Sequence, residues 1–203
     1  MLLLLSILSP LLPIIAGLRR RNNFLWWYAV CSILNEGLVP VVRRCFQAEV
    51  AITSNLFALC ECCLIFLFYK NKVFPKGTLF YFWLGISLSF FITLTTFDTG
   101  WFRLNRLGIS VFLIEYIGLS IWGFFTILRQ QKILFLEQSS FFWSNIAILI
   151  YSSGAFFLFL LTIHIKTAAD KATLIQLWNT LFLSLNILKN ILLAIALSKK
   201  EDA

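Results

Sequence analysis

Seven apolar stretches, each long enough to cross a membrane, follow one another along this chain. They cover residues 2–18, 24–42, 50–69, 77–97, 107–128, 138–164 and 173–198. A transmembrane helix needs about 20 predominantly apolar residues, whereas a strand of a membrane barrel needs about 9–11 residues of alternating polarity. The stretches are too long for barrel strands and do not alternate. The sequence therefore predicts an all-α, polytopic membrane protein, a single domain over residues 1–203 that forms a bundle of seven transmembrane helices.

The composition excludes several classes of protein. Hydrophobic residues make up 60% of the 203 residues and charged residues 13%, whereas a soluble domain has about a quarter of its residues charged. No long polar run remains that could fold as a separate catalytic head. The net charge of +8 comes from basic residues in the turns, where they fix topology and meet lipid headgroups. We therefore expect membrane lipids as partners and no nucleic acid, because no basic face with interleaved aromatic residues occurs.

The basic residues also predict an orientation. Ten of them fall on one side of the predicted spans, namely Arg19, Arg20, Arg21, Lys70, Lys72, Lys76, Arg129, Lys132, Lys199 and Lys200. Six fall on the other side, namely Arg43, Arg44, Arg103, Arg106, Lys166 and Lys171. The side richer in Lys and Arg is cytoplasmic in most membrane proteins, so we expect the N-terminus outside and the C-terminus in the cytoplasm. The first stretch lacks the basic start of a signal peptide and is predicted to be a retained helix, kinked by Pro10 and Pro13.

Four charged residues lie inside the predicted spans: Glu36, Glu61, Glu115 and Lys189. A charge at the bilayer centre costs about 2.5–3.5 kcal/mol on insertion scales, so such groups face protein or water and often mark function. At about 1.5 Å of rise per residue, Glu61 and Lys189 lie about 12 and 13 Å from the cytoplasmic ends of their helices. The two side chains can therefore meet at one level, and we expect them to pair.

The seventh stretch carries a polar stripe. At about 100° of rotation per residue, Gln176, Asn179, Asn186 and Asn190 fall within an arc of about 80° that we expect to face the bundle. Lys189 lies beside this arc. The predicted ligand or ion cavity comprises Glu36, Glu61, Glu115, Lys189, Asn35, Asn145, Asn186 and Asn190. The alternative is that the amides only hold helices together, at an average of about 0.6 kcal/mol per hydrogen bond.

Other features have a simpler interpretation. Trp26-Trp27-Tyr28 and Trp101-Phe102 fall at predicted interfaces, where aromatic belts are expected. The segment Tyr151-Ser152-Ser153-Gly154 supplies small residues that allow close helix approach. The thiols of Cys60, Cys62 and Cys63 do not share one helix face, and the single histidine, His164, lies at a distant helix end. We therefore expect no metal site and no cofactor.

The C-terminal 60 residues or so resemble a family of uncharacterised seven-helix inner-membrane proteins of Bacteroidota-type bacteria. The resemblance lies in three segments: Phe142-Trp143-Ser144-Asn145, the run from Tyr151 to Phe159, and Trp178 followed by the run from Leu185 to Leu192. It implies a location in the bacterial inner membrane and implies no activity. A coarser resemblance, a Lys in the seventh helix and a Glu in the third, is to microbial rhodopsins. Leu185 stands where those proteins usually carry an Asp four residues before the Lys, so no retinal is expected.

Three classes of function remain. The leading hypothesis is a non-enzymatic sensory or ligand-responsive module that reports to a cytoplasmic signalling protein. The alternative is a proton- or ion-coupled small-solute transporter in which the three glutamates carry protons. An intramembrane lipid-modifying enzyme comes third, because the chain offers no intramembrane histidine, no His-Glu metal motif and no nucleophile elbow.

Overall fold

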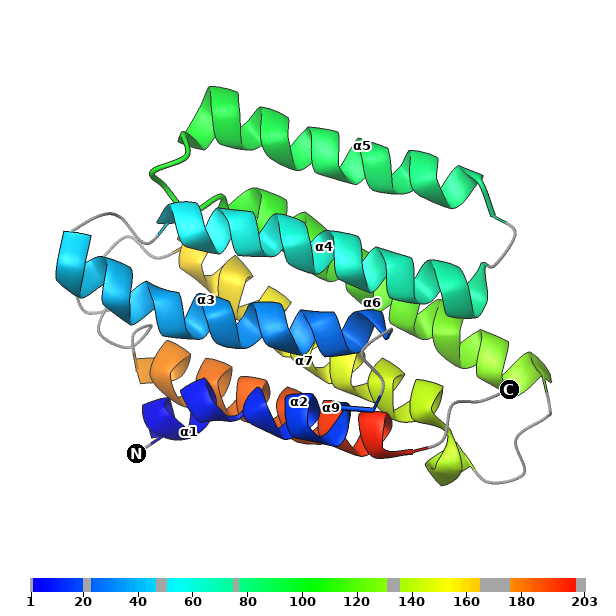
Figure 1. Ribbon diagram of the computed structural model, residues 1–203. Coiled ribbons are helices and arrows are strands. Elements are labelled where there is room, and N and C mark those ends of the chain that lie inside the picture. Colours follow the sequence, from blue (N-terminus) through cyan, green and yellow to red (C-terminus); the bar gives the residue numbers. More distant parts are fainter. Residues whose placement is uncertain are drawn as a thin grey trace. The chain divides into compact units, whose positions relative to one another are not determined.

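The computed structural model describes residues 2–19, 23–46, 51–74, 77–130, 136–164 and 176–199, without the side chains of residues 38–46, 130 and 162–164. Every regular element in these ranges is a helix (Figure 1). The chain divides into two compact units. The terminal unit contains residues 1–19 and 113–203, and the middle unit contains residues 20–112. The two units are described separately below, and the single-domain prediction stays a prediction.

The middle unit is built from consecutive helices with short connections. They are α3 (Phe24–Phe46), α4 (Ala51–Val73), α5 (Leu79–Leu94) and the first residues of α6 (Arg106–Gln130). Successive helices run antiparallel (Figure 1). The side chain of Phe66 joins α4 to α5, since its ring lies 5.3 Å from the rings of both Phe80 and Trp83. A π-helical turn, Thr95–Thr99, extends α5 before the chain reverses into α6.

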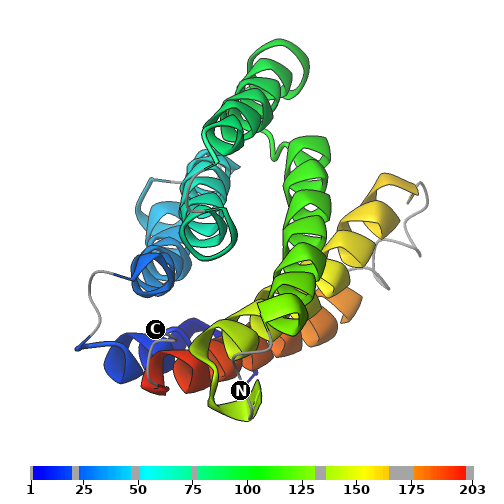
Figure 2. The ribbon, with the colours of Figure 1, turned by 90° about the vertical axis from the view of Figure 1, so that its right-hand side faces the viewer.

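The terminal unit is organised around α9 (Leu183–Ser198), against which α1 (Leu2–Leu8), α2 (Leu11–Ala16) and α7 (Ser140–His164) all pack. Ribbons of α1, α2 and α9 run side by side in both views (Figures 1 and 2). The remaining elements are a short 3₁₀-helix, Leu136–Gln138, and a π-helical turn, Trp178–Phe182, that leads directly into α9. The Oγ of Ser140, at the start of α7, donates to the carbonyl of Ala196, near the end of α9, at 2.8 Å. These two helices are therefore antiparallel.

The first apolar stretch is interrupted at its first proline. The regular helix gives way to a turn at Ser9 and Pro10, between α1 and α2, although the backbone of Pro10 keeps helical dihedral angles (φ −65°, ψ −15°). Pro10 has no N–H to donate to the carbonyl of Ser6; instead that carbonyl accepts hydrogen bonds from the Oγ and the N–H of Ser9, at 2.8 and 3.2 Å. The apolar segment Leu2–Ala16 is shorter than the roughly 20 residues that a spanning helix needs.

Five described helices are long and apolar enough to cross a membrane: Ala51–Val73, Leu79–Thr99, Arg106–Arg129, Ser140–Leu161 and Trp178–Ser198. They coincide with five of the seven predicted stretches. The chain thus has the helices of a multi-pass integral membrane protein. The seven-helix count and the orientation stay predictions; of the residues used for the orientation, Arg20, Arg21, Lys76, Lys132, Lys166, Lys171 and Lys200 lie outside the described residues, as do the side chains of Arg43 and Arg44.

The close approach predicted around Gly154 is confirmed. A Cβ atom on Gly154 would overlap the Cδ1 atom of Leu185 on α9 and would lie 3.0 Å from its Cδ2 atom. The absence of a side chain at Gly154 therefore lets α7 and α9 pack at this level.

We predict that Gly154→Ala destabilises the protein by about 1–3 kcal/mol, the usual cost of adding a methyl group to a packed interface. Unfolding by SDS titration from mixed micelles measures this cost. Leu185→Ala in the same chain should recover part of the loss. Gly118→Ala on α6 is the matched control, because a Cβ there meets none of the described residues within 4 Å. Equal stability of the two single variants would contradict the prediction.

Candidate functional site

Lys189 is a buried cation in the terminal unit. It lies on α9, only 3% of it is exposed, and its Nζ lies 4.3 Å from the centroid of the Tyr151 ring on α7. The negative face of an aromatic ring attracts an ammonium group, by about 0.5–1 kcal/mol at exposed sites and about 2 kcal/mol or more when the pair is desolvated. The lysine therefore points at the neighbouring helix α7.

A row of aromatic rings leads to this lysine. The ring of Phe159 lies 5.1 Å from that of Trp178, which stacks on Phe182 at 4.7 Å. Phe182 in turn lies 6.0 Å from Tyr151. Trp178 and Phe182 are the first and last residues of the π-helical turn before α9. Because single π-helical turns are rare and frequently occur at functional sites, this turn and Lys189 together form the strongest candidate site in the terminal unit.

The two amides next to Lys189 hold the first apolar segment. Asn186 donates from Nδ2 to the Oγ of Ser6 at 2.9 Å. One turn later, Asn190 donates to the Oγ of Ser9 at 2.7 Å. All four side chains are buried. The pair Ser9–Asn190 follows the pair Ser6–Asn186 on both segments, so α1 and α2 run parallel to α9. Asn186 and Asn190 thus join the first apolar segment to α9, and their part in a ligand cavity stays a prediction.

The predicted stripe does not extend to the start of the seventh stretch. Gln176 and Asn179 are exposed, whereas Asn186, Lys189 and Asn190 are buried. The physical reason for this difference in exposure is the π-helical turn Trp178–Phe182, which contains Asn179 and precedes α9. A π-helical turn closes its hydrogen bonds from i to i+5 instead of i to i+4, so the constant rotation assumed from sequence fails across Trp178–Phe182. The expectation that Gln176 and Asn179 face the protein interior was therefore wrong.

Glu61 is a buried acid in the middle unit. It lies on α4, 8% of it is exposed, and its Oε1 accepts a hydrogen bond of 2.8 Å from the Oη of Tyr28 on α3. Tyr28 itself is buried. The tyrosine is therefore a partner of a buried carboxylate, and its assignment to an interfacial aromatic belt was wrong. The signal that was missed is the combination of a tyrosine in one span with a carboxylate in the next.

The remaining predicted site residues lie on other helices. On α3, Asn35 and Glu36 are both half-buried, and Ser32 donates to the Oε1 of Glu36 at 3.4 Å. In the terminal unit, Glu115 is half-buried on α6, and Asn145 on α7 donates to the carbonyl of Ser120 on α6 at 2.7 Å. Asn145 therefore ties α6 to α7.

The predicted pair of Glu61 and Lys189 stays a prediction, because Glu61 belongs to the middle unit and Lys189 to the terminal unit. The same holds for a cavity that joins all eight residues. Within its own unit, each of the two buried charges meets a tyrosine of a neighbouring helix. Among the described residues, no group of three or more His, Cys, Asp or Glu side chains is arranged to hold a metal ion.

A second polar network of the middle unit was missed. Asn105, fully buried before the start of α6, donates from Nδ2 to the Oγ1 of Thr95 at 2.8 Å and to the carbonyl of Phe91 at 3.2 Å. Its Oδ1 caps α6 by accepting the N–H of Gly108 at 2.8 Å. An Asn just before a long apolar run is an N-cap signal. The capping role of Asn105 could therefore have been predicted from the sequence.

Asn55 on α4 completes the network. Its Oδ1 accepts the N–H of Asn105 at 3.1 Å, and its Nδ2 donates to the carbonyls of Arg103 at 2.9 Å and Trp101 at 3.4 Å. Nothing in the sequence distinguishes Asn55 from other polar residues of the third stretch, because its partners are backbone groups far along the chain. The residues Asn55, Thr95 and Asn105 are called the asparagine clamp below.

We predict that Ser9 and Asn190 are energetically coupled. Ser9→Ala removes both the acceptor for Asn190 and one of the two donors to the carbonyl of Ser6, while Asn190→Leu removes the donor to Ser9. A double-mutant cycle on SDS unfolding should give a coupling near the membrane-protein average of about 0.6 kcal/mol, and at most about 1.7 kcal/mol. The control cycle pairs Asn190→Leu with Ser198→Ala, whose Oγ bonds within its own helix end. A coupling energy of zero between Ser9 and Asn190 would contradict the hydrogen bond between them.

The terminal unit thus contains a buried ammonium group, that of Lys189, against the ring of Tyr151. The middle unit contains a buried carboxylate, that of Glu61, hydrogen-bonded to the phenol of Tyr28. Either can bind a charged group or exchange a proton. Comparisons with known proteins find no match for this chain among family models, curated proteins or solved structures.

Proposed function

We propose that this chain is a seven-span membrane module, with its N-terminus outside and its C-terminus in the cytoplasm of a bacterium, that responds to a small ligand bearing a negative charge. In this proposal it performs no chemistry of its own and passes the response to a cytoplasmic signalling protein. The resemblance of its last two apolar stretches to seven-helix inner-membrane proteins supports the location.

The observation that carries the proposal is the burial of Lys189 inside a candidate span against the ring of Tyr151. Ionisable residues within membrane helices are rare and mark ligand, ion or proton sites. The ring attracts the ammonium through its quadrupole. A buried ammonium group also attracts carboxylate and phosphate groups, with which it forms charge-assisted hydrogen bonds, and this chemistry supports a ligand with a negative charge.

Two local features supply a means of response. The π-helical turn Trp178–Phe182 contacts aromatic residues of α7 and leads directly into the helix that carries Lys189. A change of this turn to α-helical geometry rotates the residues before it relative to α9. The interruption at Pro10 lies in the segment that packs on another face of α9, that of Asn186 and Asn190. A ligand that interacts better with one of two such packings shifts the population toward it.

We predict that Lys189→Met, which keeps the length of the side chain and removes its charge, abolishes ligand retention. The protein is extracted from its native membrane in polymer-bounded lipid particles, and retained small molecules are identified by mass spectrometry. The wild type should retain an anionic compound that the variant lacks. The matched control is Lys70→Met, since Lys70 also lies over a tyrosine ring, that of Tyr81 at 5.3 Å, but near the end of its helix. Identical profiles for wild type and Lys189→Met would refute the proposal.

A second candidate, a proton-coupled transporter, is favoured by Glu61. Glu61 lies inside a candidate span, is 8% exposed and accepts a hydrogen bond from the phenol of Tyr28. A proton can pass between the carboxyl group and the phenol of such a pair. Chains of such groups form the proton relays of pumps and transporters. In this alternative Glu61, with Glu36 and Glu115, carries the proton and Lys189 supplies a counter-charge.

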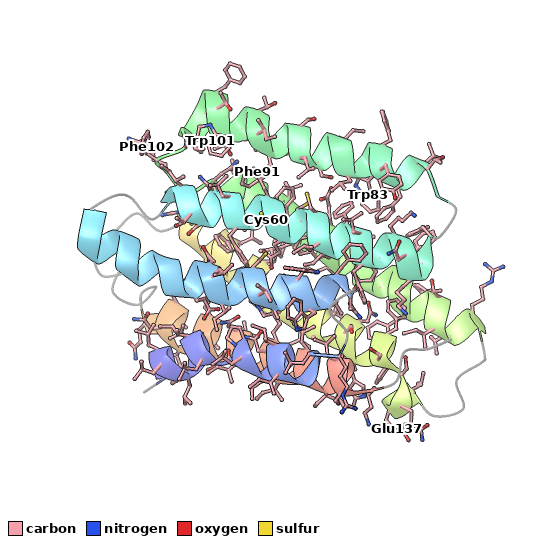
Figure 3. All side chains as sticks on the ribbon, in the orientation of Figure 1. Cys60, Trp83, Phe91, Trp101, Phe102 and Glu137 are labelled. Atoms are coloured by element: carbon pink, nitrogen blue, oxygen red, sulfur yellow. The ribbon has the colours of Figure 1, made fainter. Side chains whose placement is uncertain are left out.

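We predict for this alternative that Glu61→Gln lowers proton flux in proteoliposomes at least tenfold, as the amide cannot carry a proton. Internal pyranine reports acidification under an imposed pH gradient. Glu137→Gln serves as the control because Glu137 is exposed in the 3₁₀-helix before α7 (Figure 3). Wild-type flux in the Glu61→Gln vesicles, or no flux through the wild type itself, would eliminate the transporter.

A further inference from the structure

The turn between α5 and α6 is placed by its neighbours at the surface of the membrane. It connects two consecutive candidate spans, Leu79–Thr99 and Arg106–Arg129. Only residues 100–105 separate them, so both spans must leave the hydrocarbon core at this point. Whatever side chains the turn exposes therefore lie at the depth of the lipid headgroups.

The asparagine clamp gives this turn a fixed shape. Asn55 reaches from α4 to the carbonyls of Trp101 and Arg103, and Asn105 reaches back to Phe91 and Thr95 on the preceding helix. The chain reverses at Gly100, whose φ of 74° is a conformation that other residues rarely adopt. Asn105 is also packed tightly against Gly108, where a Cβ would lie 2.7 Å from its Nδ2. The turn is thus held to three helices rather than lying loose.

The clamp presents aromatic and basic side chains outward. Phe97 is 85% exposed and Phe102 is 66% exposed. Figure 3 shows the ring of Phe102 projecting away from the helices at this end of α5. Arg103 and Arg106 are exposed beside them, and the exposed acid Asp98 leaves the turn with a net positive charge. Fixing two phenyl rings in the exposed position is unfavourable in water and favourable in a lipid interface.

We propose that this turn is a docking site for anionic phospholipids, in which Phe97 and Phe102 enter the acyl-chain boundary while Arg103 and Arg106 bind the headgroup phosphate. A planar guanidinium with five donors matches a phosphate group in two-point geometry. The hydrogen bonds of the clamp use the backbone carbonyl of Arg103 and leave its side chain out of the network. The site combines a fixed apolar wedge with two cations, and its charge selects phosphatidylglycerol over phosphatidylcholine.

The test uses the photo-reactive residue p-benzoylphenylalanine in place of Phe102, and separately in place of Phe97, in the full chain. Each protein is reconstituted into vesicles of pure dioleoyl-phosphatidylcholine or of phosphatidylcholine with one-third dioleoyl-phosphatidylglycerol. After irradiation, mass spectrometry of the intact protein identifies the lipid that has been captured. The same label in place of Phe91 is the control, because that ring is buried and stacks on Phe112 at 4.9 Å.

Labels at positions 97 and 102 should capture lipid, and the label at position 91 should not. In the mixed vesicles, phosphatidylglycerol should be captured in excess of its share by about fivefold for each arginine that contacts it. Arg103→Gln with Arg106→Gln should reduce the captured lipids to their share in the vesicle while capture itself continues. Arg19→Gln with Arg129→Gln, at other helix ends, should leave the excess unchanged.

Three results would overturn the proposal. The first is no lipid capture at either position by a protein whose helical circular dichroism is that of the wild type. The second is capture of phosphatidylcholine and phosphatidylglycerol in proportion to the vesicle composition. The third is capture of another protein chain at these positions, which would make the turn a protein-docking surface.

Discussion

In a bilayer, a polar side chain on a helix must find its partner within the protein, because the hydrocarbon offers none. The pairs Ser6–Asn186 and Ser9–Asn190 show what this constraint does to the fold. They are spaced by about one turn on both segments, so they fix the register and the direction of the first apolar segment along α9. The two segments run parallel. The proline break is part of the same arrangement, since it turns Ser9 Oγ toward both Asn190 and the carbonyl of Ser6.

Tyrosines accompany the buried charge of each unit in different ways. Tyr28 offers its hydroxyl to the carboxylate of Glu61, whereas Tyr151 offers its ring face to the ammonium of Lys189. A phenol can do both because its edge and hydroxyl are positive while its face is negative. In surroundings of low dielectric these interactions are stronger than in water. Each charge therefore has a defined position within its unit, which a site that binds ligand or protons requires.

The sequence predicts the helices well and their polar contacts poorly. Long apolar runs identify the five candidate spans, because length and hydropathy are local properties. Gly154 could also be predicted, since small residues allow close approach whatever the partner. Tyr28, Asn55 and Ser9 could not, because their roles depend on groups that the fold brings from distant parts of the chain. The predicted burial of Gln176 and Asn179 was wrong for another reason. Helical faces are predicted from a constant rotation per residue, and the π-helical turn interrupts that rotation.

Lys189 faces protein and not lipid, and nuclear magnetic resonance on the reconstituted protein can test this orientation. With ¹⁵N-lysine and ¹³C-tyrosine labels, the Nζ of Lys189, assigned by its loss in Lys189→Met, should show through-space cross-peaks to the ring carbons of Tyr151, as expected for a distance of 4.3 Å to the ring centroid. It should show none to the acyl chains of the lipid. Cross-peaks to acyl chains without cross-peaks to a tyrosine ring would place the ammonium on the outer surface of the helices and contradict the account.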